Sequence, residues 1–310
     1  MEESKFKVSV VAPVLNNKKR ITKFLEALLN QNYNKDLYEI IIIDNGSSDG
    51  TIDIIKKFDV ILLFEHEKLG SPYSARNRGI EKASGDIIAL LDSDCIPKGD
   101  WLSKAIACFH NKEADIIGGK VIFHYDGEKT AAKIFDANNN IQMKESILER
   151  QIAKTANLFV RREVFNHIGL FPEGIRSGGD VRWTKHASFS GFKIVFCEKA
   201  CVWKPARGIK GLIKKHWRVA LVHPTIWLEE GGGNYDFLLL LIIFLKRLTF
   251  FSLIKPHKKV QSFKKRLKNK DIKKYRIRIL LIGFFIYIIM NLANFVAILK
   301  MVFTSIRNKS

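Results

Sequence analysis

An alternation of short apolar β-type runs with helical patterns, in the N-terminal third of the chain, constrains the fold more than any other feature. The apolar runs occupy residues 6–12, 39–43, 59–64 and 86–91, and the helical segments between them occupy 21–29, 51–58 and 73–83. Runs that are apolar throughout are typical of parallel strands buried on both faces. The pattern therefore predicts an α/β fold with a Rossmann-like, mostly parallel sheet covered by helices.

Polar or loop-forming residues stand where three of these apolar runs end. They are Pro13, Asp44 and Asp92. Because ligands bind outside the carboxyl ends of the strands in open parallel sheets, we expect these three residues to mark one edge and the site. A nicotinamide-binding Rossmann protein is a weaker interpretation, since the first strand is followed by Pro13-Val14-Leu15-Asn16 without a glycine-rich phosphate loop.

The sequence Asp92-Ser93-Asp94 places two carboxylates directly after a buried strand. Such a pair can reach a hard divalent cation, Mg²⁺ or Mn²⁺, that also binds phosphate oxygens. A polar turn that ends a strand is the alternative, and the position at the sheet edge favours the metal site. Asp44 follows four isoleucines, which favours a carboxylate that accepts hydrogen bonds from a base or ribose, whereas Asp49 suits a helix cap.

Five blocks in a fixed order resemble those of the family 2 glycosyltransferases of the GT-A fold. The blocks are Val10-Val11-Ala12-Pro13, Asp44–Thr51, Ala75–Ile80 with Gly85-Asp86 and Asp92-Ser93-Asp94, Ala156–Arg162 with Phe171-Pro172-Glu173, and Gly178-Gly179-Asp180 with Arg182 and Trp183. Each block alone is weak evidence for the family, but the ordered set is strong evidence. The resemblance extends over residues 6–218.

This resemblance implies that the donor is a nucleotide-diphosphate sugar. We expect a UDP-sugar, and a GDP-sugar is the alternative. Ala12 and Pro13 would line the nucleotide pocket, and Asp44 would bind the base. Arg76 would lie near the nucleotide, although a surface charge on a helix is an equally simple interpretation. Asp92 would lie near the ribose and bind the metal ion.

The same resemblance implies the chemistry. Asp94 would bind the metal, Mn²⁺ or Mg²⁺, and Asp180 would be the general base that takes the acceptor proton while a single displacement inverts the anomeric carbon. The donor or acceptor pocket would be shaped by Asn157, Gly179 and Trp183. For Trp183, a place in the hydrophobic core is an equally good interpretation. The expected acceptor is a glycan or lipid-linked intermediate in cell-envelope polysaccharide or glycolipid assembly.

The chain departs from the family in two places. Gly179 stands where many relatives have Glu, so Asp180 lacks an acidic neighbour that would raise its pKa by like-charge repulsion. Residues 214–218 lack the Gln-x-x-Arg-Trp motif of processive synthases, so we expect transfer of a single sugar. The alternatives are a polyprenyl-phosphate glycosyltransferase, whose acceptor is a phosphate, and a catalytically inactive membrane-bound nucleotide-binding scaffold.

The basic residues are concentrated towards the C-terminus. Residues 237–310 contain 17 Lys and Arg and one acidic residue, so they carry +16 of the net charge of +21. The uncharged run 279–299 has 21 residues, which is long enough to cross a bilayer and makes a buried core helix the weaker interpretation. We therefore predict a transmembrane helix over 279–303.

Two segments before this run are predicted to lie at the membrane surface. Twelve Lys and Arg fall within 255–278, a basic stretch that the positive-inside rule places in the cytoplasm against anionic headgroups. Lys246 and Arg247 interrupt the apolar segment 237–254, which favours an interfacial amphipathic helix, since charges at mid-bilayer are costly. Because aromatic residues are sparse in the basic stretch, we expect no nucleic-acid partner.

Residues 1–236 have the balanced charge of an ordinary globular protein and are expected to form one catalytic domain. No signal peptide precedes the first strand, so we expect this domain on the cytoplasmic side of the cytoplasmic membrane, with its four cysteines reduced. Within it, residues 129–149 and 208–230 are predicted to form one helix each.

Overall fold

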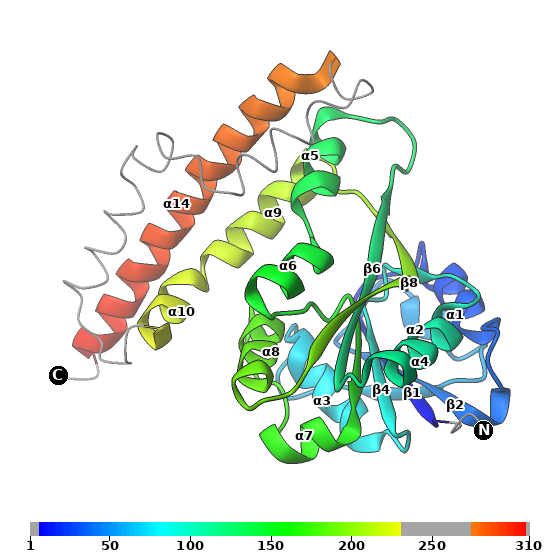
Figure 1. Cartoon of the computed structure of the whole chain (residues 1–310). Helices are drawn as coiled ribbons and strands as arrows, with labels where there is room; N and C mark the ends of the chain where they lie inside the picture. Colours follow the sequence, from blue (N-terminus) through cyan, green and yellow to red (C-terminus); the bar gives the residue numbers. More distant parts are fainter. Residues whose placement is uncertain (1–5, 231–273, 308–310) are drawn as a thin grey trace. The chain divides into compact units, whose positions relative to one another are not determined.

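A computed structural model of the chain describes residues 6–230 and 274–307 (Figure 1). The described residues form two compact units. The sheet unit contains the chain up to His124 together with Ile141–Pro205, and the helical unit contains Tyr125–Asn140 and the residues from Ala206 onwards. The predicted interfacial helix at 237–254 and most of the predicted basic stretch lie outside the described residues.

Within the described residues, the sheet unit is built on a single sheet of eight strands in the order β3-β2-β1-β4-β7-β6-β8-β5. The strands are β1 (Val8–Val14), β2 (Tyr38–Asp44), β3 (Ile61–Phe64), β4 (Ile87–Leu91), β5 (Ile96–Pro97), β6 (Ile116–His124), β7 (Asn157–Arg161) and β8 (Ile194–Pro205). The half formed by β3, β2, β1 and β4 is parallel, as the apolar runs predict. The other half is mixed, because β7 runs antiparallel to both β4 and β6, and β5 runs antiparallel to β8.

Helices cover both faces of this sheet (Figure 1). They are α1 (Ile21–Leu29), η1 (Lys35–Leu37), α2 (Thr51–Ile55), α3 (Pro72–Lys82), α4 (Trp101–Lys112), α6 (Met143–Arg150), α7 (Arg162–Ile168) and α8 (Gly179–Phe189). Alternate residues of β2 enter different cores: Ile42 packs with residues of α1 and α4, and Ile41 with residues of α3, α7 and α8. Burial on both faces is the reason that the strand sequences are apolar throughout.

The parallel half of the sheet brings the predicted strand ends to one edge. β1 lies between β2 and β4, with Val14 paired to Asp44 and Val11 paired to Leu90. The three strands run in the same direction, so Asp44, the last residue of β2, and Asp92, which follows β4, lie at the same edge. The expectation that these residues mark one edge is confirmed.

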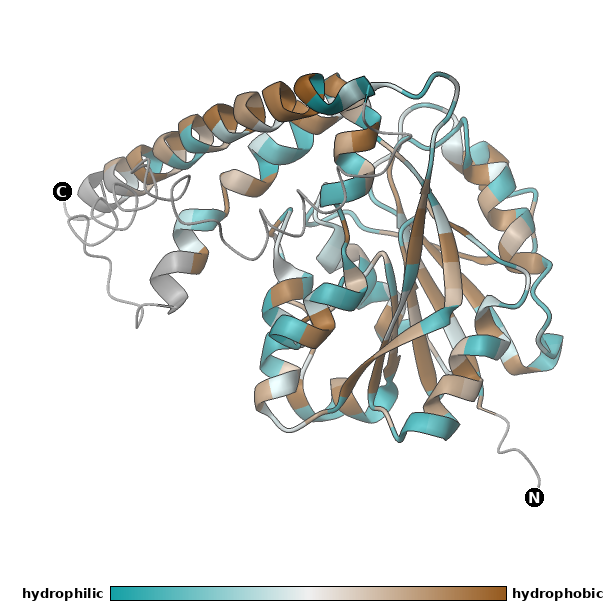
Figure 2. Ribbon diagram, turned by 45° about the horizontal axis from the view of Figure 1, so that its top comes forward, coloured by the Kyte–Doolittle hydropathy of each residue, from teal (hydrophilic) through white to brown (hydrophobic). Residues whose placement is uncertain are grey.

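The helical unit contains α5 (Ala131–Asn139), α9 (Ile209–Ala220), α10 (His223–Glu230) and α14 (Arg276–Arg307) among its described residues. Its apolar core joins α5, α9 and α14 through side chains such as Phe135, Leu212 and Ile286. The 26 residues Arg276–Met301 of α14 are long and apolar enough to cross a membrane, and they include the predicted run 279–299. Figure 2 shows hydrophobic residues along most of this helix, and Leu281 is 62% exposed, unlike a residue of a core helix.

Two predicted long helices are each broken in the structure. The segment 129–149 forms α5 and α6, which belong to different units, because Asn140 is extended and Ile141 has a positive φ of 32°. The segment 208–230 forms α9 and α10 with a break at Leu221. Pro224 stands at the start of α10 and has no N–H to continue the ladder of α9.

Candidate active site

Asp92 and Asp94 follow β4 at the carboxyl edge of the sheet, and two cations contact them. Arg76, from α3, donates to Asp92 Oδ1 at 2.7 Å. Lys204, near the end of β8, donates to Asp92 Oδ2 at 3.0 Å and also to Asp94 Oδ1. Both cations are buried, with 2% of Arg76 and 1% of Lys204 exposed. The interpretation of Arg76 as a surface charge on a helix is therefore wrong.

The ligand atoms of Asp92, Asp94 and Cys95 lie within 4.8 Å of one another. The carboxylate oxygens are suitable ligands for Mg²⁺ or Mn²⁺. Burial raises the pKa of the Cys95 thiol well above its ordinary value, and Mg²⁺ and Mn²⁺ prefer oxygen ligands to sulfur. The Lys204 ammonium, 3.4 Å from Cys95 Sγ, contacts all three groups, so with this lysine in place the three do not fit a metal ion.

Asp180 lies in the first turn of α8, where Gly178 precedes the helix in the left-handed region with φ 81°. Its Oδ1 accepts hydrogen bonds from the Tyr73 hydroxyl at 3.0 Å and from the Val181 N–H at 2.9 Å. Burial, reinforced by the negative charge of Asp180, raises the pKa of Tyr73, so the phenol keeps its proton and acts as the donor. Among the described residues, both hydrogen bonds to the carboxylate go to Oδ1.

A continuous series of contacts joins Asp180 to the Asp-x-Asp carboxylates. Tyr73 donates to Asp180, and the Arg76 guanidinium carbon lies 5.7 Å from the centre of the Tyr73 ring. Arg76 in turn binds Asp92. Because Tyr73 and Arg76 lie on one face of α3, this helix holds the two acidic positions in a fixed relation.

Asp44 ends β2 and is 3% exposed. Its Oδ2 accepts the backbone N–H groups of Gly46 and Ser47, both at 3.0 Å, within a turn that needs the positive φ of Gly46. Its Oδ1 has no hydrogen-bond partner among the described residues. A buried, unsatisfied acceptor is costly, so this oxygen is available for a donor group on a ligand.

The remaining predicted site residues are buried. Ala12 and Pro13 lie inside β1, next to the end of β2. Asn157 is fully buried and makes three hydrogen bonds, accepting from Trp101 Nε1 at 2.9 Å and donating to the carbonyls of Lys120 and Ala200 at 3.0 Å. These contacts join β7 to β6, β8 and α4, and they use both N–H groups and the oxygen of the amide.

Trp183 and Gly179 are packed against aromatic rings. Trp183 stacks on Phe165 with ring centres 4.6 Å apart, and its Nε1 donates to the Gly169 carbonyl at 2.8 Å. At Gly179, an added Cβ would lie 2.9 Å from carbon atoms of the Tyr73 ring. The ring of Tyr73 thus occupies the space that a side chain at position 179 would need.

Sequence reasoning missed two residues of this site, Tyr73 and Lys204. Tyr73 was visible only as the start of a predicted helix. Lys204 directly follows the apolar and aromatic run Cys201-Val202-Trp203. A lone charge at the end of such a run is the signal that could have drawn attention to it.

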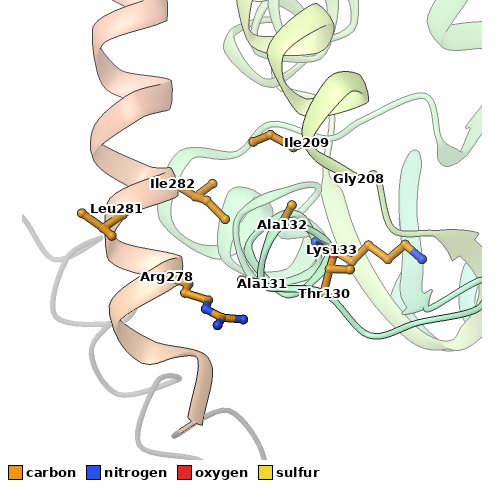
Figure 3. Close-up of a pocket in the computed structure, with 9 residues that line it drawn as sticks. All are labelled: Thr130, Ala131, Ala132, Lys133, Gly208, Ile209, Arg278, Leu281 and Ile282. Carbon is orange, nitrogen blue, oxygen red and sulfur yellow. Dashed lines mark hydrogen bonds between the residues drawn. The ribbon is translucent and has the colours of Figure 1, made fainter.

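The helical unit has a cavity of about 530 Å³ (Figure 3). Side chains of α5, α9 and α14 line it, including Ala132, Ile209 and Ile282, with Arg278 at one side. It contains none of the residues that the sequence predicts for the site.

Comparisons with known proteins identify the family of the chain. The model of glycosyl transferase family 2 matches residues 9–169, just over half of the chain. Glycosyltransferase AglE of Haloferax volcanii is 42% identical over 228 residues, which cover 72% of this chain and 75% of that protein. The chain therefore belongs to glycosyl transferase family 2, and it is a glycosyltransferase.

Solved structures show the same fold. The chain resembles Staphylococcus aureus TarS 1–349 in complex with UDP-GlcNAc, with a TM-score of 0.51 and 21% identity over 70% of this chain and 66% of that chain. It also resembles the mannosyltransferase PcManGT of Pyrobaculum calidifontis in complex with GDP-Man and Mn²⁺, with a TM-score of 0.63 and 18% identity over 94% and 87% of the chains. The predicted GT-A fold is confirmed.

Proposed function

We propose that this chain transfers a single sugar from a nucleotide-diphosphate sugar to the hydroxyl of a glycan or lipid-linked acceptor, with inversion at the anomeric carbon. The series of contacts from Asp180 through Tyr73 and Arg76 to Asp92 carries the proposal, because it joins a base to a nucleotide-side carboxylate. The carboxyl edge of the sheet, where these residues lie, is where α/β folds bind ligands.

In this mechanism Asp180 takes the proton of the acceptor hydroxyl as the oxygen attacks the anomeric carbon and the bond to the diphosphate breaks. Tyr73 and the Val181 N–H hold Oδ1, which leaves Oδ2 to receive the proton. The Tyr73 hydroxyl stays protonated and therefore orients the carboxylate without competing for that proton. Asn157, Gly179 and Trp183 support the pocket by packing rather than by touching the sugar.

The open acceptor at Asp44 Oδ1 suits the nucleobase. Uracil and guanine each present a ring N–H donor, and the two structural neighbours contain UDP-GlcNAc and GDP-Man. Asp44 receives such a donor at the end of β2, beside Ala12 and Pro13. A UDP-sugar remains the default donor in this proposal.

The counter-charge for the diphosphate has two candidates. The sequence predicts Mn²⁺ or Mg²⁺ on Asp92 and Asp94, and the PcManGT structure contains Mn²⁺. In this chain the Lys204 ammonium binds the same two carboxylates. A metal there would act as a Lewis acid on the leaving group.

We also propose that the chain is attached to a membrane through α14. This helix is long and apolar enough to span a bilayer. Nucleotide sugars and the basic stretch 255–278 both favour the cytoplasmic side of the cytoplasmic membrane, where a lipid-linked acceptor and anionic headgroups are available.

Asp180→Asn tests the role of the base. The amide still accepts a hydrogen bond from Tyr73 but cannot take a proton, so donor binding and the melting temperature should stay as in the wild type while transfer falls by roughly 10²–10⁴-fold. Normal transfer by a folded Asp180→Asn protein to a polyprenyl phosphate would favour that alternative, because a phosphate nucleophile needs no base. Normal transfer to a hydroxyl acceptor would refute the assignment.

A further inference from the structure

Lys204 has an unusual environment for a lysine. Its side chain is 1% exposed, and its Nζ lies within bonding distance of Asp92 Oδ2, Asp94 Oδ1 and Cys95 Sγ. These are the three groups whose ligand atoms come together as a candidate metal site. The ammonium therefore stands where an ion held by the three would stand.

With Lys204 in place, the charges of Asp92, Asp94, Arg76 and Lys204 sum to zero. Asp92 and Asp94 contribute two negative charges, and Arg76 and Lys204 contribute two positive charges. A divalent cation bound to the same oxygens would either be repelled by the ammonium or displace it. Displacement would separate the buried ammonium from the Asp92 and Asp94 carboxylates, and a buried charge that loses a paired charge is strongly destabilised.

We propose that the Lys204 ammonium takes the place of the divalent cation at Asp92 and Asp94, so that the chain binds its nucleotide diphosphate without a metal ion. The proposal rests on the proposed function, since it concerns the donor of that reaction. Lys204 acts as a positioning residue: it holds both carboxylates and cancels charge that would otherwise repel the diphosphate. Without Lys204, the cluster keeps a net negative charge and needs a metal ion.

The Lys204 ammonium is buried beneath the carboxylates that it contacts. The carboxylates of Asp92 and Asp94 are each about one-third exposed, at 32% and 33%, whereas Lys204 lies beneath them. The ammonium therefore lowers the negative charge that the two carboxylates present to the diphosphate. Because the ammonium carries one positive charge and a divalent cation carries two, we expect Arg76, which binds Asp92, to supply the second essential positive charge.

The test compares four forms of the full chain in detergent: wild type, Lys204→Met, Lys204→Arg and the control Lys120→Met. Methionine keeps the length of the side chain without its charge, and arginine restores the charge. Lys120 pairs with Glu198 at 2.9 Å on an exposed part of the sheet, so its loss changes the net charge equally but leaves the cluster intact. Melting temperatures establish that each form is folded, and Lys204→Ala replaces Lys204→Met if the latter does not fold.

The first measurement is the affinity for Mn²⁺ without nucleotide, from the electron paramagnetic resonance signal of the free ion. We expect Lys204→Met to bind Mn²⁺ at least about tenfold more tightly than the wild type, because the like charge that contacts the same carboxylates is removed. Lys204→Arg and Lys120→Met should match the wild type. Equal or tighter Mn²⁺ binding by the wild type would overturn the proposal.

The second measurement is calorimetric binding of UDP and GDP, in EDTA and with Mn²⁺. The wild type should bind one nucleotide equally well in both, and Lys204→Met should bind it at least about tenfold more weakly in EDTA than with Mn²⁺. A wild type that needs Mn²⁺ for nucleotide binding would overturn the proposal. If no form binds either nucleotide in any condition, the proposed function fails, whereas the Mn²⁺ affinities still decide the role of Lys204.

Discussion

Gly179→Ala is the substitution for which the structure gives the sharpest expectation. The added Cβ would lie 2.9 Å from three carbon atoms of the Tyr73 ring, closer than real Cβ contacts. The ring cannot retreat easily, because it is 5% exposed and packs against Phe171 with ring centres 5.9 Å apart. Its movement would also break the hydrogen bond from Tyr73 to Asp180.

Two terms set the magnitude. Overpacking of a well-packed core costs about 1–3 kcal/mol. Alanine is the better helix former, by up to about 1 kcal/mol, which offsets part of this cost in the first turn of α8. The net loss of about 1–2 kcal/mol lowers the melting temperature by roughly 2–8 °C for a unit of this size. The rate of sugar transfer should fall by more than the loss of folded protein explains, because Asp180 also loses the Tyr73 hydroxyl that orients it.

The control is Gly99→Ala. The nearest atom to a Cβ at position 99 is the Asn30 carbonyl oxygen at 3.9 Å, so this substitution meets only ordinary contact. Tyr73→Phe separates the two effects, since it keeps the ring and removes the hydroxyl: transfer should fall without any clash. Thermal unfolding and transfer rates of the three variants in detergent test the reasoning. Equal melting temperatures and transfer rates for Gly179→Ala and Gly99→Ala would refute it.

Three further predictions concern single polar side chains. Asn157→Leu removes the amide partner of Trp101 Nε1 and of two carbonyls at about 1–3 kcal/mol each, so we expect a loss of roughly 3–9 kcal/mol in urea unfolding, and a loss under 1 kcal/mol would show that water replaces the amide. Asp44→Asn keeps a carbonyl oxygen for the Gly46 and Ser47 N–H groups but replaces the open oxygen with an N–H donor, so it should weaken nucleotide binding at least about tenfold in calorimetry; unchanged affinity would remove Asp44 from the base pocket. Burial acts to raise the pKa of Glu39, but hydrogen bonds from Ser9 and Ser84 outweigh it and hold the pKa below its ordinary value. Its stabilising contribution is therefore complete above the ordinary pKa and is lost as the pH falls through the lowered one, so the stability difference between wild type and Glu39→Gln should shrink on acidification, and a pH-independent difference would contradict this assignment.

The sequence was most informative where local pattern and burial agree. The four positions before Asp44 are all isoleucine because both faces of β2 are covered by apolar cores. The same burial makes each parallel strand recognisable as an apolar run in the sequence. The position of Asp44 and Asp92 at one edge then follows from the rule for parallel strands. The antiparallel strand β7 was not predicted, because its sequence, Asn157–Arg161, gives no sign of direction.

The partners of the site residues could not be predicted, because they come from distant parts of the chain. Lys204 is 112 residues from Asp92, and Tyr73 is 107 residues from Asp180. No periodicity connects such positions. The resemblance to the family brought Asp180 and Asp92 into one hypothesis, but it did not indicate that a lysine would contact both Asp-x-Asp carboxylates.

Some of the family-like residues prove to be structural. A Cβ at Gly79 would collide with Val11 and Ile43, so this glycine allows α3 to approach the sheet. The Asn77 amide exchanges hydrogen bonds with the backbone of Phe171, at 2.9 and 3.1 Å. These contacts hold the segment before α8 against α3, where Tyr73 meets Asp180.

The most direct test of the central claim is sugar transfer by the full chain in detergent from a panel of UDP- and GDP-sugars. Release of nucleotide and incorporation of label into glycan or lipid-linked acceptors are both recorded. The account predicts that one nucleotide sugar binds and loses its sugar, and that Asp180→Asn binds the same donor equally well without transferring it. A folded protein that binds no donor in the panel, with or without Mn²⁺, would contradict the account.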